Sequence, residues 1–115
     1  RYNTLDCLTD RLDHHKDQVL SSFDYQGEPI LLSEFGGIKM GDGAGWGYQR
    51  VNGPQEFLER FAPLMRTVYG KVLAGYCYTQ LTDTEQETNG LLTADRQPKF
   101  PIDTLRAIIT QPRGW

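Results

Sequence analysis

Runs of apolar residues and apolar residues at helical spacing divide the chain into a few predicted elements. Residues 30–33 form a continuous apolar or near-apolar run that ends at Glu34, and it favours a parallel strand over residues 30–35, buried on both faces. Residues 72–80 form a second run, rich in apolar and aromatic residues, and they are predicted to be a strand too. Between the two strands, a helix of amphipathic pattern is predicted from Pro54 to Gly70. A strand, a helix and a strand in succession form a βαβ unit, which requires a parallel strand pair.

Two further helices are predicted outside this unit. An amphipathic helix is expected somewhere in residues 4–21, and a last helix covers about residues 103–110. Residues 36–53 are rich in glycine and are predicted to form a long loop without the pattern of a phosphate-binding loop. Trp46 and Tyr48 lie among these glycines. Their rings either stack on the apolar face of a ligand or anchor the loop to the sheet.

The composition is that of one globular, soluble domain and excludes several classes of function. The chain has 115 residues, of which 38% are hydrophobic and 23% charged. Its net charge of −3 argues against a nucleic-acid surface, and no apolar run reaches the length of a membrane helix. Because the sequence starts at Arg1 with neither an initiator Met nor a signal-peptide pattern, we expect a piece of a longer protein.

The cysteines and histidines do not indicate a metal site. Cys7 and Cys77 are far apart, and two free, mostly buried thiols are expected, with one long-range disulfide as the alternative. Free thiols favour a cytoplasmic over a secreted protein. His14 and His15 are adjacent, so in a helix their side chains diverge and cannot share a ligand. No metal or cofactor is expected.

Glu34 is the leading candidate for chemistry. It lies near the carboxyl end of the first predicted strand and precedes the glycine pair Gly36 and Gly37. A charge at the end of a buried strand needs a partner or a wet cavity, and parallel α/β folds build their active sites at this end. Glu34 therefore suits a nucleophile, a general base or a metal ligand. The structural alternative is an ion pair with Arg50 or Arg96.

Two motifs resemble those of known glycosidases. Leu-Ser-Glu-Phe-Gly-Gly at residues 32–37 resembles the nucleophile strand of clan A glycoside hydrolases, which ends in a Glu. The segment from Gly75 to Lys99, with Tyr-Thr-Gln-Leu-Thr-Asp, Asn-Gly-Leu-Leu and Asp-Arg-Gln-Pro-Lys in order, resembles the eighth strand and following loop of glycoside hydrolase family 2. That family includes β-galactosidases, β-glucuronidases and β-mannosidases.

The resemblance covers about residues 28–109 and implies a fold and an activity. The implied fold is the C-terminal part of a (β/α)₈ TIM barrel, with residues 1–28 as the preceding helix and loop, 29–109 as strand 7 to helix 8 and 110–115 as a tail. The implied activity is that of a retaining β-glycosidase, a hydrolase of O-glycosidic bonds, with Glu34 as the nucleophile. The implied substrate-binding residues are Trp46, Tyr48, Tyr78, Gln80, Asn89, Asp95 and Arg96.

One part of the family pattern is absent from this sequence. The acid/base of the family is a Glu that usually follows an Asn, and the chain has no Asn-Glu dipeptide. A complete barrel takes about 250 residues, so this chain is expected to lack half of the catalytic pair and to be inactive alone. Its expected partners are a carbohydrate substrate and either the rest of the barrel or a second copy of itself. The alternatives are a non-catalytic carbohydrate-binding or interaction piece, or another clan A glycosidase such as an endoglucanase.

Overall fold

The computed structural model describes residues 25–70 and 72–111, which form a small mixed α/β unit. The helix expected in residues 4–21, the two histidines and Cys7 lie outside these residues. The described elements, in chain order, are β1 (Leu31–Gly36), β2 (Ile38–Met40), β3 (Gln49–Val51), α2 (Pro54–Val68), β4 (Gly75–Thr79) and α3 (Ile102–Ile109). No helix among the described residues is long and apolar enough to cross a membrane.

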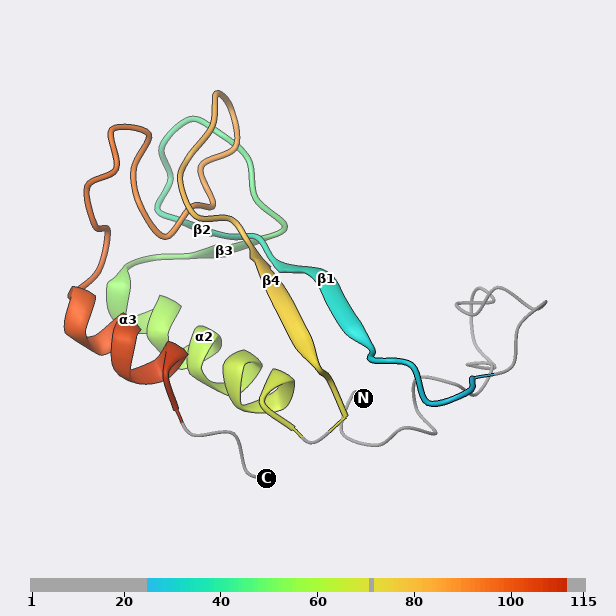
Figure 1. The fold of residues 1–115 in the computed structure, drawn as a ribbon. Helices are drawn as coiled ribbons and strands as arrows, with labels where there is room; N and C mark the ends of the chain where they lie inside the picture. The colour runs from blue at the N-terminus through green and yellow to red at the C-terminus, as the bar shows by residue number, and fades with distance from the viewer. Residues whose placement is uncertain (1–24, 71, 112–115) are drawn as a thin grey trace.

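β1 and β4 form a parallel pair, which confirms the predicted pairing of the two longest strands (Figure 1). Their register places Leu31 opposite Gly75 and Gly36 opposite Thr79. The expectation that the first strand is buried on both faces is wrong, since the Leu31 side chain is 66% exposed. Leu32 and Phe35 pack against the core, whereas no element that the structure describes covers the other face of β1.

The glycine content predicted one continuous loop over residues 36–53, and this prediction is wrong. β2 and β3 lie within this segment and pair in parallel, with Ile38 opposite Gln49 and Met40 opposite Val51. The physical reason is burial, because the Ile38 and Val51 side chains are 1% and 0% exposed and join the hydrophobic core. Three-residue strands are too short to leave a periodic pattern in a glycine-rich sequence.

Helix α2 supplies the centre of the core. It begins at Pro54, as predicted, and ends at Val68, two residues before Gly70. The Phe57 ring stacks on Phe61 and on Phe100, with ring centroids 5.3 Å and 4.0 Å apart. Among residues 25–70 and 72–111, the buried apolar side chains are Ile38, Val51, Phe57, Phe61, Met65, Val68, Leu73, Leu91, Phe100 and Leu105.

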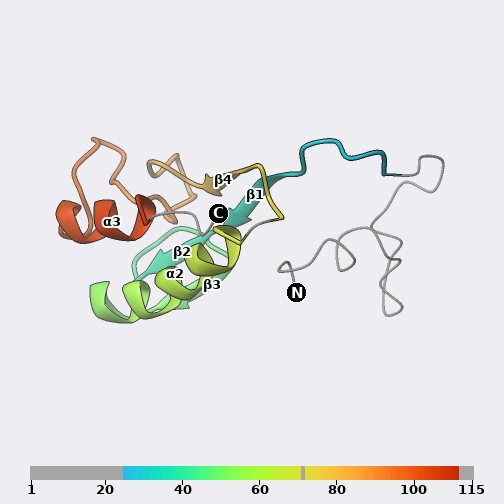
Figure 2. The same cartoon turned by 60° about the horizontal axis from the view of Figure 1, so that its bottom comes forward.

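The last helix, α3, agrees with its prediction. It packs beside α2, and both helices contribute side chains to the hydrophobic core. α3 turns Leu105 into the core, and Ile108 and Ile109 pack beside it. Figures 1 and 2 show α3 beside α2, and Figure 1 shows the long connecting segments gathered beyond the carboxyl ends of β1 and β4. This arrangement leaves those strand ends free to build a site.

Candidate functional site

A pocket lies at the carboxyl ends of the paired strands β1 and β4. Its volume is about 240 Å³. The lining residues come from both strands and from the glycine-rich segment: Glu34, Phe35, Gly36, Tyr48 and Thr79. The pocket therefore contains the candidate nucleophile and one of the two candidate aromatic residues. It lies where parallel α/β folds place their active sites.

A β-bulge turns Glu34 away from the core. The register of β1 against β4 shifts between Leu32 and Phe35, where two residues of β1 face a single residue of β4. Ser33 and Glu34 are both exposed as a result, while the Phe35 ring packs edge-on against the tyrosines of β4. Bulges of this kind occur next to active sites, where they redirect a side chain. Sequence reasoning missed this bulge, although the spacing of three between Leu32 and Phe35 departs from the strand period of two.

Glu34 makes no ion pair with any described residue. Arg50, one of the two expected partners, pairs instead with Asp42. Arg96, the other, lies exposed in a turn in which its backbone N–H donates to the carbonyl of Thr93. The structural alternative for Glu34 is therefore not supported, and the carboxylate is available within the pocket.

The glycine pair after β1 joins three parts of the site. Gly36 and Gly37 have positive φ angles of 108° and 71°, a region that favours glycine. The Gly37 N–H donates to the Thr79 carbonyl at 2.7 Å, and the Gly37 carbonyl accepts from the Tyr48 N–H at 2.8 Å. A Cβ at Gly37 would lie 2.4 Å from the Tyr48 ring. The absence of a side chain here lets Tyr48 lie directly over the strand end.

Tyr78 is a core residue and does not line the pocket, contrary to the expectation that it faces the substrate. Its ring packs edge-on against Phe35 and Phe61, with centroid distances of 5.4 Å and 5.1 Å. Burial raises the pKa of Tyr78 to about 12, and the nearby Ile38 backbone acts in the opposite direction. The reason is strand alternation, which turns Tyr78 inward and leaves Thr79, one residue later, to line the pocket.

Trp46 and Tyr48 form an exposed aromatic pair beside the pocket. Their side chains are 45% and 66% exposed, and their ring centroids are 4.6 Å apart at an interplanar angle of 65°. The loop itself is anchored through its backbone, because Trp46 N–H donates to the Gln86 carbonyl and the Trp46 carbonyl accepts from Thr88 N–H. The backbone thus holds the loop while the rings remain open to a ligand.

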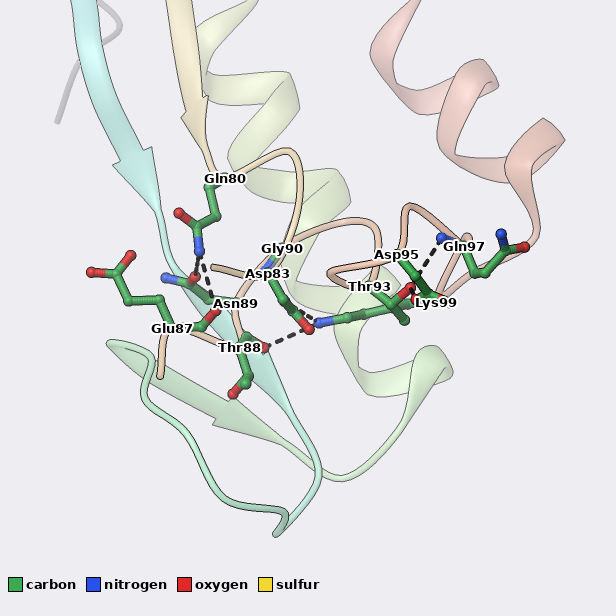
Figure 3. A network of polar contacts seen from close by, with 10 residues as sticks. All are labelled: Gln80, Asp83, Glu87, Thr88, Asn89, Gly90, Thr93, Asp95, Gln97 and Lys99. Carbon is green, nitrogen blue, oxygen red and sulfur yellow. Dashed lines mark hydrogen bonds and ion pairs between the residues drawn. The ribbon is translucent and has the colours of Figure 1, made fainter. Parts of the chain in front are cut away.

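A polar network organises the segment that follows β4 (Figure 3). Gln80 Nε2 donates to Asn89 Oδ1 at 2.7 Å, and Asn89 is fully buried. Lys99 Nζ lies 2.6 Å from Asp83 Oδ1 and donates to the Thr88 carbonyl at 3.1 Å. The same Asp83 oxygen accepts from the Gly90 N–H at 2.8 Å. This network fixes the two predicted substrate-binding residues Gln80 and Asn89 relative to each other.

The Asn89 amide is a buried donor close to Gly37, the residue that follows the pocket-lining Gly36. Its Nδ2 has no hydrogen-bond partner among the described residues, and a Cβ on Gly37 would lie 3.4 Å from it. An unsatisfied buried donor is costly. Asn89 therefore retains an unused hydrogen-bond donor directly behind the strand end that Tyr48 covers.

Asp95 and Arg96 lie apart from this part of the network. Both are exposed, and the Thr93 hydroxyl donates to the Asp95 carboxylate within the same turn. In Figure 3, Asp95 lies well away from Gln80 and Asn89, beyond the Lys99 side chain. The structure brings Glu34, Tyr48, Gln80 and Asn89 to one end of the sheet with Trp46 at its rim, and it leaves Asp95 and Arg96 in a separate turn.

The comparisons with known proteins identify no family. No protein-family model matches the chain, and no curated protein matches it. The glycosidase resemblance therefore rests on its two sequence motifs.

The residues that line the pocket suit covalent or acid–base chemistry in which a single carboxylate, that of Glu34, reacts. Glu34 is the only carboxylate among the residues that line the pocket. No group of three or more His, Cys, Asp and Glu side chains suited to a metal occurs within residues 25–70 and 72–111. Cys77 is a free thiol, and it is exposed rather than buried, because it lies on the outer face of β4. The site thus offers an accessible nucleophile or base next to ring-stacking aromatics.

Proposed function

We propose that the chain is the C-terminal part of the catalytic barrel of a retaining β-glycosidase similar to glycoside hydrolase family 2. In this proposal β1 and β4 are strands 7 and 8, and Glu34 is the nucleophile. The observation that supports it most strongly is the bulge in β1, which presents Glu34 to a pocket at the carboxyl ends of a parallel strand pair. Structural features of this kind are typical of barrel active sites.

The proposed chemistry requires two carboxyl groups. The Glu34 carboxylate forms a bond to the anomeric carbon of the sugar, and the bond from that carbon to the leaving oxygen breaks. The second carboxyl protonates the leaving oxygen and later activates the water that hydrolyses the covalent intermediate. The pocket lining provides only the first. Trp46 and Tyr48 provide exposed rings for the apolar face of the sugar.

The nucleophile can be tested without the second carboxyl. A 2-deoxy-2-fluoro-β-galactoside of dinitrophenol carries a leaving group acidic enough to depart as the phenolate, so no proton donor is needed. We expect the 115-residue chain to gain one fluorogalactosyl group on Glu34, located by mass spectrometry of peptides, and Glu34→Gln to gain none. The matched control is Glu59→Gln, which removes an exposed carboxylate on α2 and should leave the labelling unchanged.

Three results would contradict the proposal. Labelling of Glu34→Gln to the wild-type extent would show that another group reacts. A folded wild-type chain that gains no label would show that Glu34 is not a nucleophile in this chain. Clear turnover of aryl galactosides that Glu34→Gln abolishes would show that the chain already holds its acid/base.

A non-catalytic carbohydrate-binding role is the second candidate, and the exposed Trp46–Tyr48 pair favours it. A binder needs the aromatic rings and has no use for a carboxylate at the strand end. Galactoside binding that is lost in Trp46→Ala and retained in Glu34→Ala, together with no labelling of Glu34, would favour binding over catalysis.

The proposal also assigns a partner to the open face of the sheet. Leu31 is 66% exposed on a strand that pairs, among the described residues, only with β4. Unpaired strand edges and exposed apolar side chains promote association with other strands. In the proposed enzyme, the remaining strands of the barrel cover this face, and a second copy of the chain is the alternative occupant.

A further inference from the structure

Lys39 contacts the loop that carries the aromatic pair. It is the middle residue of β2, where it pairs with Arg50 of β3. Its ammonium group donates to the Gly43 carbonyl at 2.5 Å and to the Gly45 carbonyl at 2.9 Å. Both carbonyls belong to residues 41–48, which connect β2 to β3. Hydrogen bonds from a charged donor are stronger than those between neutral groups, so these two bonds fasten the loop to β2.

Lys39 contacts the chain on both sides of Trp46. Gly45, which precedes Trp46, accepts the hydrogen bond from the ammonium group. Gly47, which follows it, packs so closely that an added Cβ would lie 2.6 Å from the Lys39 Cβ. The indole of Trp46 is therefore carried on a backbone segment that touches Lys39 at its two ends.

The same segment is also fixed by the chain that follows β4. Trp46 N–H donates to the Gln86 carbonyl at 2.5 Å, and Thr88 N–H donates to the Trp46 carbonyl at 3.0 Å. A Cβ on Gly45 would lie 2.4 Å from the Thr88 side chain. Between Lys39 and the 86–88 segment, the backbone at Trp46 has little freedom to move, while its ring remains exposed.

The position of Tyr48 follows from the same loop. Its ring packs on Trp46 and lines the pocket that contains Glu34. We infer that Lys39 is a positioning residue, whose ammonium group holds residues 41–48 so that the Trp46–Tyr48 pair stays at the edge of the Glu34 pocket. The inference rests on the proposed function for its use, since a preorganised aromatic pair reduces the ordering cost of binding a sugar ring. The Lys39 ammonium group itself forms no hydrogen bond with any of the residues that line the pocket.

The test separates positioning from general stability by a ring-to-ring signal. In the Trp115→Phe background, where Trp46 is the remaining tryptophan, nuclear Overhauser effects are measured between the Trp46 and Tyr48 rings and between Phe57 and Phe100. We expect Lys39→Met to reduce the Trp46–Tyr48 effect at least fivefold and to leave the core effect unchanged. The matched control is Arg50→Met, which removes a positive charge from β3 and the ion pair to Asp42 but no hydrogen bond to Gly43 or Gly45.

Several outcomes would overturn the inference. A folded Lys39→Met that keeps the full Trp46–Tyr48 effect would do so, and so would an equal loss in Arg50→Met. If Lys39→Met does not fold, the wild-type chain decides through its lysine ammonium resonances. A Lys39 ammonium group that exchanges with water as fast as a solvated lysine would then contradict the inference, and a protected one would support it.

A binding measurement keeps this inference distinct from the proposed function. Methyl β-galactoside is titrated against the wild type and Lys39→Met, with Tyr48 and Trp46 signals as the readout. We expect the dissociation constant to rise about tenfold in Lys39→Met. If the wild type shows the ring-to-ring effect and does not bind the sugar, the proposed function fails while the role of Lys39 in positioning the pair stands. If the sugar binds equally well to both chains, the role of Lys39 in ligand binding is refuted.

Discussion

Replacing Gly36 with alanine should strongly destabilise the site, because two separate features of the structure exclude a side chain there. Gly36 ends β1 with a φ angle of 108°, and a Cβ at this position would lie 2.3 Å from Tyr78 Cε2. An L-residue forced into a left-handed conformation costs at least about 1–2 kcal/mol. The overlap with a ring packed between Phe35 and Phe61 adds about 1–3 kcal/mol, as overpacking does in other cores.

The expected loss in free energy of unfolding is therefore about 2–5 kcal/mol. It is measured by urea unfolding, with the slope of the transition compared between variants to confirm that the folded state keeps its compactness. In a Tyr78→Leu background the ring is gone, and the cost of Gly36→Ala should fall by about 1–3 kcal/mol, which separates the overlap from the backbone contribution.

Gly43→Ala provides the matched control on the same segment. Gly43 has no positive φ, nothing lies within 4 Å of an added Cβ, and its carbonyl remains available to Lys39. Alanine there should leave stability within about 0.5 kcal/mol or raise it by up to about 1 kcal/mol, because it restricts the unfolded chain. If Gly36→Ala proves as mild as Gly43→Ala, the Tyr78 ring does not pack against the end of β1 as closely as the structure shows.

Two further predictions concern buried polar groups. The pKa of Tyr78 is raised from 10.0 to about 12 by burial, so the stability that this group contributes is complete below pH 10 and is lost as the pH rises from 10 towards 12. The expected loss in free energy of unfolding is about 3 kcal/mol. Tyr78→Phe should not show this loss when unfolding is followed from pH 10 to pH 12. Equal pH dependence in both chains would refute the raised pKa of Tyr78. Lys99→Met should destabilise by about 3 kcal/mol in urea unfolding, since Lys99 and Asp83 are only 11% and 15% exposed; a loss under about 1 kcal/mol would contradict a mostly buried ion pair.

Local patterns predicted the elements whose signals lie within one stretch of sequence. Pro54 and the apolar stripe after it placed the start of α2 correctly, and the two apolar runs identified β1 and β4 as a parallel pair. The position of Glu34 at the pocket followed from the same pairing, since parallel strands bring their carboxyl ends together. These features depend on the chain's own periodicity and on a topological rule that needs no side-chain detail.

Features that depend on contacts distant in sequence could not be predicted in the same way. The Asp83–Lys99 ion pair joins residues 16 apart across two turns, and no spacing rule indicates it. The inward direction of Tyr78 depends on the register of β4 against β1, which the bulge at Ser33 and Glu34 shifts by one residue. A strand pattern alone cannot tell which of two neighbouring residues, Tyr78 or Thr79, faces the pocket.

The bulge also links the two requirements of the proposed enzyme, a second carboxyl and a cover for the open sheet face. Leu31, Ser33 and Glu34 are all exposed, whereas Leu32 and Phe35 pack against the core. The exposed residues of β1 are therefore those directed away from α2, and a carboxyl about 5–5.5 Å from Glu34 has to approach on the side where no described element covers the strand. A polypeptide that supplies the acid/base would therefore lie on the same side of β1 as the exposed Leu31 side chain. We therefore expect restored glycosidase activity and protection of this apolar face to arise together, from the same partner.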